Sequence, residues 1–159
     1  MPFEKHMRLN VFTIGHSTHP LDRFLALLAQ HGIEVLADIR RFPGSRKFPH
    51  FNNLGLRNES FRNYADYMLT KEFRESVKQL LAVATSKPTA FMCSESVFWR
   101  CHRRLVSDFL LVNGITIQHI MPSGELRPHT LTKGARAETG ELRYPPPDEA
   151  ADQASTLSE

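Results

Sequence analysis

The sequence predicts a single α/β domain built on a mainly parallel sheet of about four strands, with helices on both faces. Short apolar or β-branched runs alternate along the chain with stretches whose apolar residues recur at helical spacing. The resulting order, β-α-β-α-α-β-α-β, favours parallel pairing through right-handed crossovers. A chain of 159 residues with 41% hydrophobic residues is long enough for one domain with an ordinary core.

The first strand and helix are predicted between residues 10 and 32. The run from Asn10 to Ile14 is short and β-branched, and Gly15 ends it. Pro20 suits the first position of a helix, and the apolar residues that follow keep helical spacing until Gly32, a residue type that favours helix ends.

A second strand is predicted over residues 33–39, where the run Val35-Leu36-Ala37 is apolar on both faces, as in a sheet covered on each side. Residues 40–51 follow as a loop rich in proline and cations. Two helices come next, with Asn58 and Thr70 as their capping residues.

The second half of the chain predicts a third strand at residues 89–92, a helix from about Cys101 to Gly114, and a fourth strand at residues 115–120. Residues 121–147 are rich in turn formers and charge. They predict either a small hairpin or an extended arm across the domain.

The two ends of the chain differ from the domain, which we place at residues 10–147. Residues 1–9 are an N-terminal extension, and residues 148–159 form an acidic, disordered tail after three consecutive prolines. The tail holds four of the 17 acids and none of the 20 Lys and Arg, so residues 1–147 carry a formal charge of +7 against +3 for the whole chain. A basic domain is compatible with phosphate-bearing partners, although charge alone does not select them.

The sequence shows no uninterrupted apolar start and no apolar run of membrane-spanning length, which predicts a cytoplasmic protein with no membrane partner. Its two cysteines do not form a disulfide framework. In a reducing compartment they are expected as thiols, metal ligands or packing residues.

The stretch from Cys93 to Arg104 gathers the reactive side chains. It holds both cysteines, Glu95, His102 and three arginines within twelve positions, between the third strand and the next helix. In an α/β domain such a junction lies at the carboxyl end of the sheet, where ligands usually bind.

Three such junctions are expected to converge if the sheet is parallel. They are Gly15-His16-Ser17 after the first strand, Asp38 with Arg40 after the second, and Cys93 with Glu95 after the third. Asp38 and Glu95 can divide acid and base roles between them. Equally, Asp38 can pair with a loop arginine, and Glu95 can be an acid at a helix start.

Cys93 has several readings. Its thiolate can be a nucleophile stabilised by Arg100, Arg103 and helix amides, or the residue can simply pack in the core. A zinc site from Cys93, Cys101 and His102, perhaps with His16, requires a spacing that is unusual for zinc, and a disulfide or redox pair is a further alternative.

The loop from Arg40 to Phe51 mixes cations with phenylalanines. Its cations are Arg40, Arg41, Arg46 and Lys47, and its aromatics are Phe42, Phe48 and Phe51. This composition suits a surface that neutralises phosphates and stacks on bases, or a solvated loop whose aromatics pack inward.

Taken together, the motifs resemble the DUF488 family, a domain of unknown function. The motifs are Thr13-Ile14-Gly15-His16-Ser17, Asp38-Ile39-Arg40 with Pro43 and Ser45-Arg46, Cys93-Ser94-Glu95, and Cys101-His102-Arg103, and the resemblance runs from about residue 10 to residue 145. It implies an α/β domain and makes these positions candidates for the family's site, without assigning an activity. Relatives usually carry a longer segment where this chain has residues 52–54.

The resulting hypothesis is an enzyme that binds a nucleotide or nucleic-acid phosphate through Arg40, Arg46 and Arg103. Asp38 and Glu95 would carry hydrolytic or transfer chemistry, assisted by His16 or Cys93, with no cofactor specified. The remaining phosphate- or substrate-binding candidates are Gly15, Ser17, Ser45, Arg100, Cys101 and His102. The alternatives are a nucleic-acid-binding module without catalysis, and a thiol- or zinc-dependent protein that uses Cys93 and Cys101.

Overall fold

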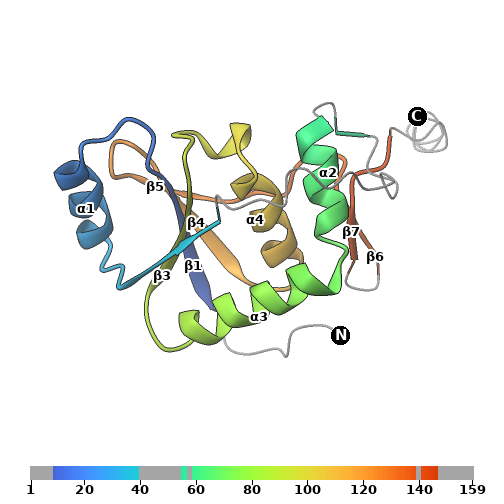
Figure 1. The fold of residues 1–159 in the computed structure, drawn as a ribbon, viewed down its shortest axis with the longest axis horizontal. Coiled ribbons are helices and arrows are strands. Elements are labelled where there is room, and N and C mark those ends of the chain that lie inside the picture. Colours follow the sequence, from blue (N-terminus) through green and yellow to red (C-terminus); the bar gives the residue numbers. More distant parts are fainter. Residues whose placement is uncertain (1–8, 40–54, 57–58, 139–140, 147–159) are drawn as a thin grey trace, which may run out of the picture.

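The computed structural model describes residues 9–39, 55–56, 59–138 and 141–146 (Figure 1). The predicted acidic tail, the basic loop from Arg40 to Phe51, and all of the N-terminal extension except Leu9 lie outside the described residues. No helix within these ranges is both apolar enough and long enough to cross a membrane.

The elements follow the predicted order. The helices are α1 (Leu21–Gln30), α2 (Glu59–Tyr67), α3 (Lys71–Ala84), the short 3₁₀ helix η1 (Phe98–Arg100) and α4 (Arg103–Val112). The strands are β1 (Asn10–Gly15), β2 (Val35–Asp38), β3 (Thr89–Cys93), β4 (Thr116–Ile120), β5 (Leu126–Pro128), β6 (Arg136–Glu138) and β7 (Glu141–Arg143).

Within the described residues, five strands form one sheet in the order β2-β3-β1-β4-β5. The strands β1 to β4 are parallel, and β5 runs antiparallel to β4. The α/β fold with a mainly parallel sheet is therefore confirmed. Residues 121–147, for which a hairpin and an arm were both open, contribute the added strand β5 and the separate hairpin of β6 and β7.

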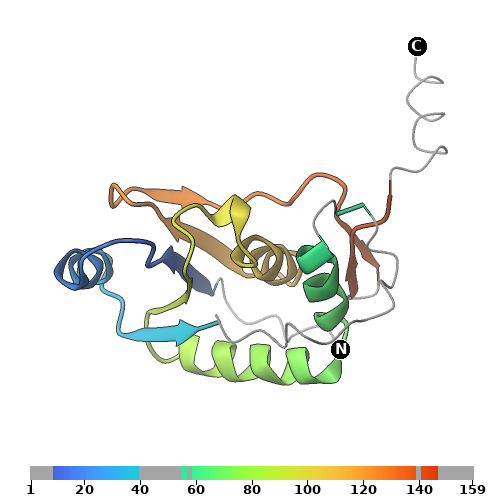
Figure 2. The ribbon, with the colours of Figure 1, turned by 45° about the horizontal axis from the view of Figure 1, so that its top comes forward.

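Side chains alternate between the two faces of the sheet, because successive residues of a strand point in opposite directions. One face packs Ile14, Met92 and Ile120 against Phe24 and Leu27 of α1. The other face packs against α2, α3 and α4, with a larger core whose strand members are Val11, Phe91 and Ile117. Figures 1 and 2 show α1 set apart from the other helices, with the sheet between them. We call these the α1 face and the α4 face.

Local signals explain several helix ends. The Thr70 side chain accepts a hydrogen bond from the backbone N–H of Phe73 at 3.2 Å, which confirms the predicted cap of α3. Gly32 and Gly114 follow α1 and α4 with φ of +67° and +85°, backbone conformations that suit glycine. Leu36 of the edge strand β2 is 38% exposed, so the covering predicted for both faces of this strand is wrong at that side chain.

Candidate functional site

The carboxyl ends of β1, β2 and β3 lie side by side. Gly15 pairs with Cys93, and Asp38 pairs with Met92. Beyond the strands, the backbone N–H of His16 donates to the Cys93 carbonyl at 3.0 Å, and that of Ser17 donates to the Ser94 carbonyl at 2.8 Å. The parallel sheet thus brings the three junctions named from the sequence to the same end of the sheet.

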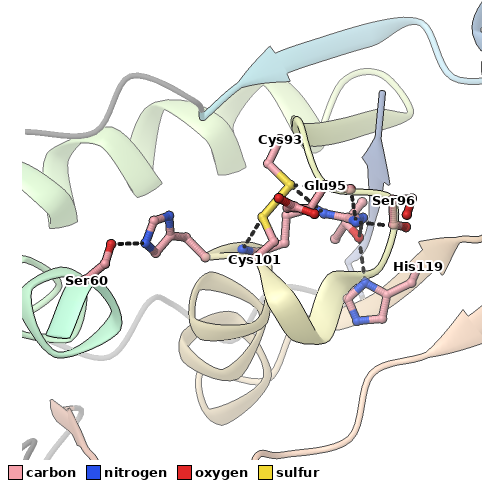
Figure 3. The surroundings of a disulfide bond; sticks show 9 residues. Ser60, Cys93, Glu95, Ser96, Cys101 and His119 are labelled. Carbon is pink, nitrogen blue, oxygen red and sulfur yellow. Dashed lines mark hydrogen bonds between the residues drawn. A yellow bond between two sulfur atoms is a disulfide. The ribbon is translucent and has the colours of Figure 1, made fainter. Parts of the chain in front are cut away.

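Cys93 and Cys101 are joined by a disulfide bond in this structure (Figure 3). Cys93 ends β3 and Cys101 precedes α4, so the bond closes the loop that contains η1. Both residues are buried. The expectation of separate thiols is therefore wrong for this structure, and the disulfide alternative is the one observed. Within the described ranges, no three His, Cys, Asp or Glu side chains are grouped so that they could hold a metal ion.

Arg103 is the central cation of the site and is only 1% exposed. Its Nε donates to Cys93 Sγ at 3.1 Å, and its backbone N–H contacts Cys101 Sγ at 3.4 Å. Its Nη2 donates to the backbone carbonyls of Glu95 at 2.9 Å and Ser96 at 3.4 Å. One guanidinium therefore contacts a sulfur of the disulfide and holds the loop that the disulfide closes. Burial lowers the pKa of Arg103 to about 10, and the Glu95 carboxylate opposes that shift.

A chain of buried polar side chains leads from Arg103 into the core. Arg103 Nη1 donates to Thr13 Oγ1 at 3.0 Å, and Thr13 Oγ1 is hydrogen-bonded to Nδ1 of His119. His119 Nε2 lies 2.8 Å from Nδ1 of His129, whose Nε2 lies 2.7 Å from Oδ1 of Asp108. We call these five side chains the buried relay.

The two ends of the buried relay constrain the direction of the hydrogen bonds in it. The Arg103 guanidinium can only donate, and a carboxylate such as that of Asp108 accepts. With each imidazole carrying one proton, His129 donates to Asp108, His119 donates to His129, and Thr13 donates to His119 while accepting from Arg103. This arrangement leaves no donor of Thr13 or of the two imidazoles unpaired, which is how buried polar groups avoid a desolvation cost.

Asp108 and His119 have further partners that support this assignment. Asp108 also accepts from the Thr132 backbone N–H at 3.0 Å and from the Tyr144 hydroxyl at 2.8 Å. Burial, followed by the nearby Asp108, raises the pKa of Tyr144, so the phenol keeps its proton to donate. Burial, with His129, Arg103 and Arg127 nearby, lowers the pKa of His119 to about 2, so this imidazole is neutral.

Gly15 lets β1 approach the disulfide-closed loop closely. A Cβ atom at this position would collide with the backbone carbonyl of Glu95 and would lie 2.9 Å from Arg103 Nη2. Ser17, two residues after Gly15, has a φ of +44°, a left-handed conformation that a serine rarely adopts. Such conformations are concentrated at functional sites.

The other predicted site residues are distributed as follows. His16 is half-buried and its Nδ1 is hydrogen-bonded to the Ser17 carbonyl at 2.9 Å. Asp38, Glu95 and Arg100 are exposed. His102 stacks on Tyr64 with its Nε2 3.2 Å from Ser60 Oγ, and burial lowers its pKa. The remaining candidates, Arg40, Ser45 and Arg46, lie outside the described residues.

The sequence reasoning missed most of the buried relay and Tyr144. The histidines His119 and His129 were not singled out, nor was Asp108, and Thr13 was named only as part of a family motif. A signal for two of them is visible in the sequence. His119 interrupts an apolar strand, and Asp108 interrupts an apolar helix, at positions where a polar side chain requires a partner.

Comparison with known families identifies one match. The family DUF488, described as a domain of unknown function, matches residues 20–58 and 52–110. The two matched stretches overlap at residues 52–58, and the shorter segment expected at residues 52–54 lies within this overlap. Neither the search of curated proteins nor the search of solved structures found a match.

Proposed function

The chain belongs to the DUF488 family, a domain of unknown function, and on that premise we propose that it is a thiol–disulfide enzyme whose Cys93 and Cys101 alternate between dithiol and disulfide. The observation that carries this proposal is the 3.1 Å contact from Arg103 Nε to Cys93 Sγ. A cation beside a cysteine favours the thiolate, which is the reactive form. The backbone N–H of Arg103, in the first turn of α4, offers Cys101 a weaker form of the same help.

The proposed reaction reduces a disulfide substrate. The Cys93 thiolate attacks one sulfur of the substrate, forms a mixed disulfide and releases one substrate thiolate. The Cys101 thiolate then attacks Cys93 Sγ, which releases the second substrate thiolate and closes the protein disulfide. Two equivalents of a small thiol return the protein to the dithiol state and form their own disulfide. The burial of both cysteines favours a substrate of low molecular weight over a protein disulfide.

The test follows single turnovers by mass spectrometry. The protein is reduced, freed of reductant and mixed with oxidised glutathione as the probe. The Cys101→Ser variant is expected to stop at a mixed disulfide on Cys93, and the Cys93→Ser variant is expected to react at least a hundredfold more slowly. Ser86→Ala, a change at an exposed position ahead of β3, is the control and should behave as wild type. Equal reaction of the Cys93→Ser variant and wild type would overturn the proposal.

A second candidate is an enzyme acting on a nucleotide or nucleic-acid phosphate with Asp38 and Glu95. The observation that favours it is the adjacency of the strand ends, which brings Asp38, His16 and the loop of Glu95 to one end of the sheet. An acid–base pair at such a position is a common catalytic arrangement. Arg103 is less favourable as its phosphate ligand, since its guanidinium donates to protein acceptors.

The amide variants Asp38→Asn and Glu95→Gln separate this candidate from its alternatives. For an enzyme, nucleotide or nucleic-acid turnover is lost while binding is kept. For a binding module without catalysis, the wild type binds without turnover and both variants keep that affinity. If no nucleotide or nucleic acid is bound or turned over, both readings fail and the thiol–disulfide proposal is unaffected.

A further inference from the structure

We propose that a hollow beside the first turn of α4 binds a phosphate monoester carried on a planar ring, as in a nucleoside monophosphate. The hollow has a volume of about 610 Å³, within the usual range for small-ligand sites. Its walls come from the start of α2, the loop of η1, the first turn of α4 and residues 129–133. This proposal goes beyond the thiol chemistry and does not depend on it.

The charge of the hollow suits an anion. Arg104 and Lys133 both line it, and no Asp or Glu is among its described lining residues. A phosphate monoester carries a charge of about −1.5 to −2 at neutral pH, which two cations balance. Asp108, one turn further along α4 than Arg104, is already engaged by His129, Tyr144 and the Thr132 backbone N–H.

Arg104 carries a buried donor that the described residues do not satisfy. Its Nε has no hydrogen-bond partner, although it is removed from solvent. Its guanidinium carbon lies 5.4 Å from the centre of the Phe61 ring, an interaction that orients the cation but accepts no hydrogen bond along the N–H. An unsatisfied buried donor of a charged group is costly. The Nε is shielded from solvent, so it donates to a phosphate oxygen only when the Arg104 side chain turns toward the hollow that it lines.

Thr132 supplies a second unsatisfied polar atom in the same hollow. Its Oγ1 is buried without a hydrogen-bond partner, while its backbone N–H is fixed to Asp108 Oδ1. The hydroxyl is thus held in place by the buried relay but unused within the described part of the chain. Arg104 and Thr132 both line the hollow, and each carries one polar atom without a hydrogen-bond partner, which a side-chain rotation would bring to the oxygens of a phosphate.

The hollow also offers aromatic walls for a ring. Phe61 and Phe98 both line it, together with Leu56 and Leu131. Phe98 is held in position by parallel stacking on His119, with ring centres 3.7 Å apart. Leu131 is 41% exposed and adds apolar surface at the hollow. Bases stack on such aromatic side chains.

The test measures binding by calorimetry with the full chain, using AMP, UMP, inorganic phosphate and adenosine as probes. AMP or UMP is expected to bind saturably and more tightly than phosphate, and adenosine is expected to bind more weakly than AMP. Arg104→Gln and Thr132→Val should each weaken AMP binding, the arginine variant by about tenfold or more, as for a lost hydrogen bond to a charged group. Arg136→Gln removes an exposed cation that does not line the hollow, and should change affinity by less than twofold.

The outcomes separate the parts of the proposal. If phosphate binds as tightly as AMP, the ring contact is refuted, and if adenosine binds as tightly, the phosphate contact is refuted. Equal losses for the Arg104 and Arg136 variants would place the ligand elsewhere, and the Thr132 variant keeps that test valid if the Arg104 variant is unstable. AMP binding is measured with the disulfide intact and without glutathione, so failure of the thiol chemistry would not be mistaken for failure of this site.

Discussion

The α1 face and the α4 face of the sheet are built from alternate residues of the same strands but bury different kinds of side chain. The α1 face presents Ile14, Met92 and Ile120, and its buried cluster is apolar. The α4 face presents Thr13 and His119 at the neighbouring strand positions, and they pair with each other across β1 and β4. Among the described buried polar side chains, none comes from α1.

The comparison shows which face of the sheet can accommodate buried polar side chains. An apolar face gains stability from each methylene group that it buries, and several different arrangements of apolar side chains can fill it. The buried relay on the α4 face is stabilising only while it is complete, because one missing partner leaves a buried polar group unsatisfied. It is also the face from which the cysteines approach Arg103. The α1 face therefore depends on apolar burial alone, whereas the α4 face adds to its larger apolar core a chain of hydrogen bonds that is stabilising only when complete.

The largest effect is expected from removing the carboxylate at the inner end of the buried relay. Asp108→Ala leaves His129, Tyr144 and the Thr132 N–H without their acceptor. A loss of about 3–5 kcal/mol in the free energy of unfolding is expected, as for breaking a buried charged network. Denaturant titration measures it, and a loss below about 1 kcal/mol would show that the relay is not a unit.

On the α1 face, Leu27→Ala tests apolar burial alone. Leu27 is fully buried between α1 and the sheet. We expect a loss of about 2–5 kcal/mol in stability, from lost transfer energy and the cavity that remains. The same variant should leave the rate of Cys93 alkylation in the reduced protein unchanged. A changed rate would show that the two faces are coupled.

The pH dependence of stability comes from the α4 face. The pKa of His119 is lowered to about 2 in the folded protein, against about 6.5 for an unperturbed histidine. The unfolded chain therefore binds more protons, and stability is fully present above pH 6.5 and falls as the pH drops below it, by up to about 1.4 kcal/mol per pH unit. His102, whose pKa burial also lowers, acts in the same direction. His119→Gln should flatten the pH profile of denaturant midpoints, and an unchanged slope would exclude His119 as its source.

The smallest change, Thr13→Val, separates Arg103 from His119 without altering side-chain size. Its hydroxyl accepts from Arg103 and donates to His119, so about 1–3 kcal/mol of stability is expected to be lost. The pH profile of Cys93 alkylation should shift upward if the relay positions the guanidinium. Thr89→Val is the matched control, because Thr89 is buried on the same face and donates only to the Lys87 carbonyl. Equal shifts for both variants would contradict a positioning role.

The sequence was sufficient for the order of elements and for the position of the cysteine-rich junction. Both follow from local patterns, namely alternation in the strands, helical spacing in the helices, and reactive residues between them. The short strand β5 was not identified, since Leu126 to Pro128 carries little β-propensity and is ordered by pairing with β4.

The contacts between the side chains of the site could be predicted only in part, because they join residues that are far apart in the sequence. Thr13 and His119 are 106 residues apart, and only the register of β1 with β4 brings them together. The reach from Arg103 to Cys93 likewise depends on how α4 begins after the loop. The sequence named both Arg100 and Arg103 as partners of Cys93, and three-dimensional packing decides that Arg103 makes the contact.

The absence of a side chain at Gly15 has a practical consequence for engineering. The strand and the disulfide-closed loop touch through bare backbone there, so the loop's carbonyls reach Arg103 only because nothing projects between them. Transplanting the segment from Cys93 to Arg103 onto another parallel sheet would therefore require its acceptor strand to end in glycine as well. An acceptor strand that ends in alanine would displace the transplanted loop, and the arginine equivalent to Arg103 would lose its carbonyl acceptors.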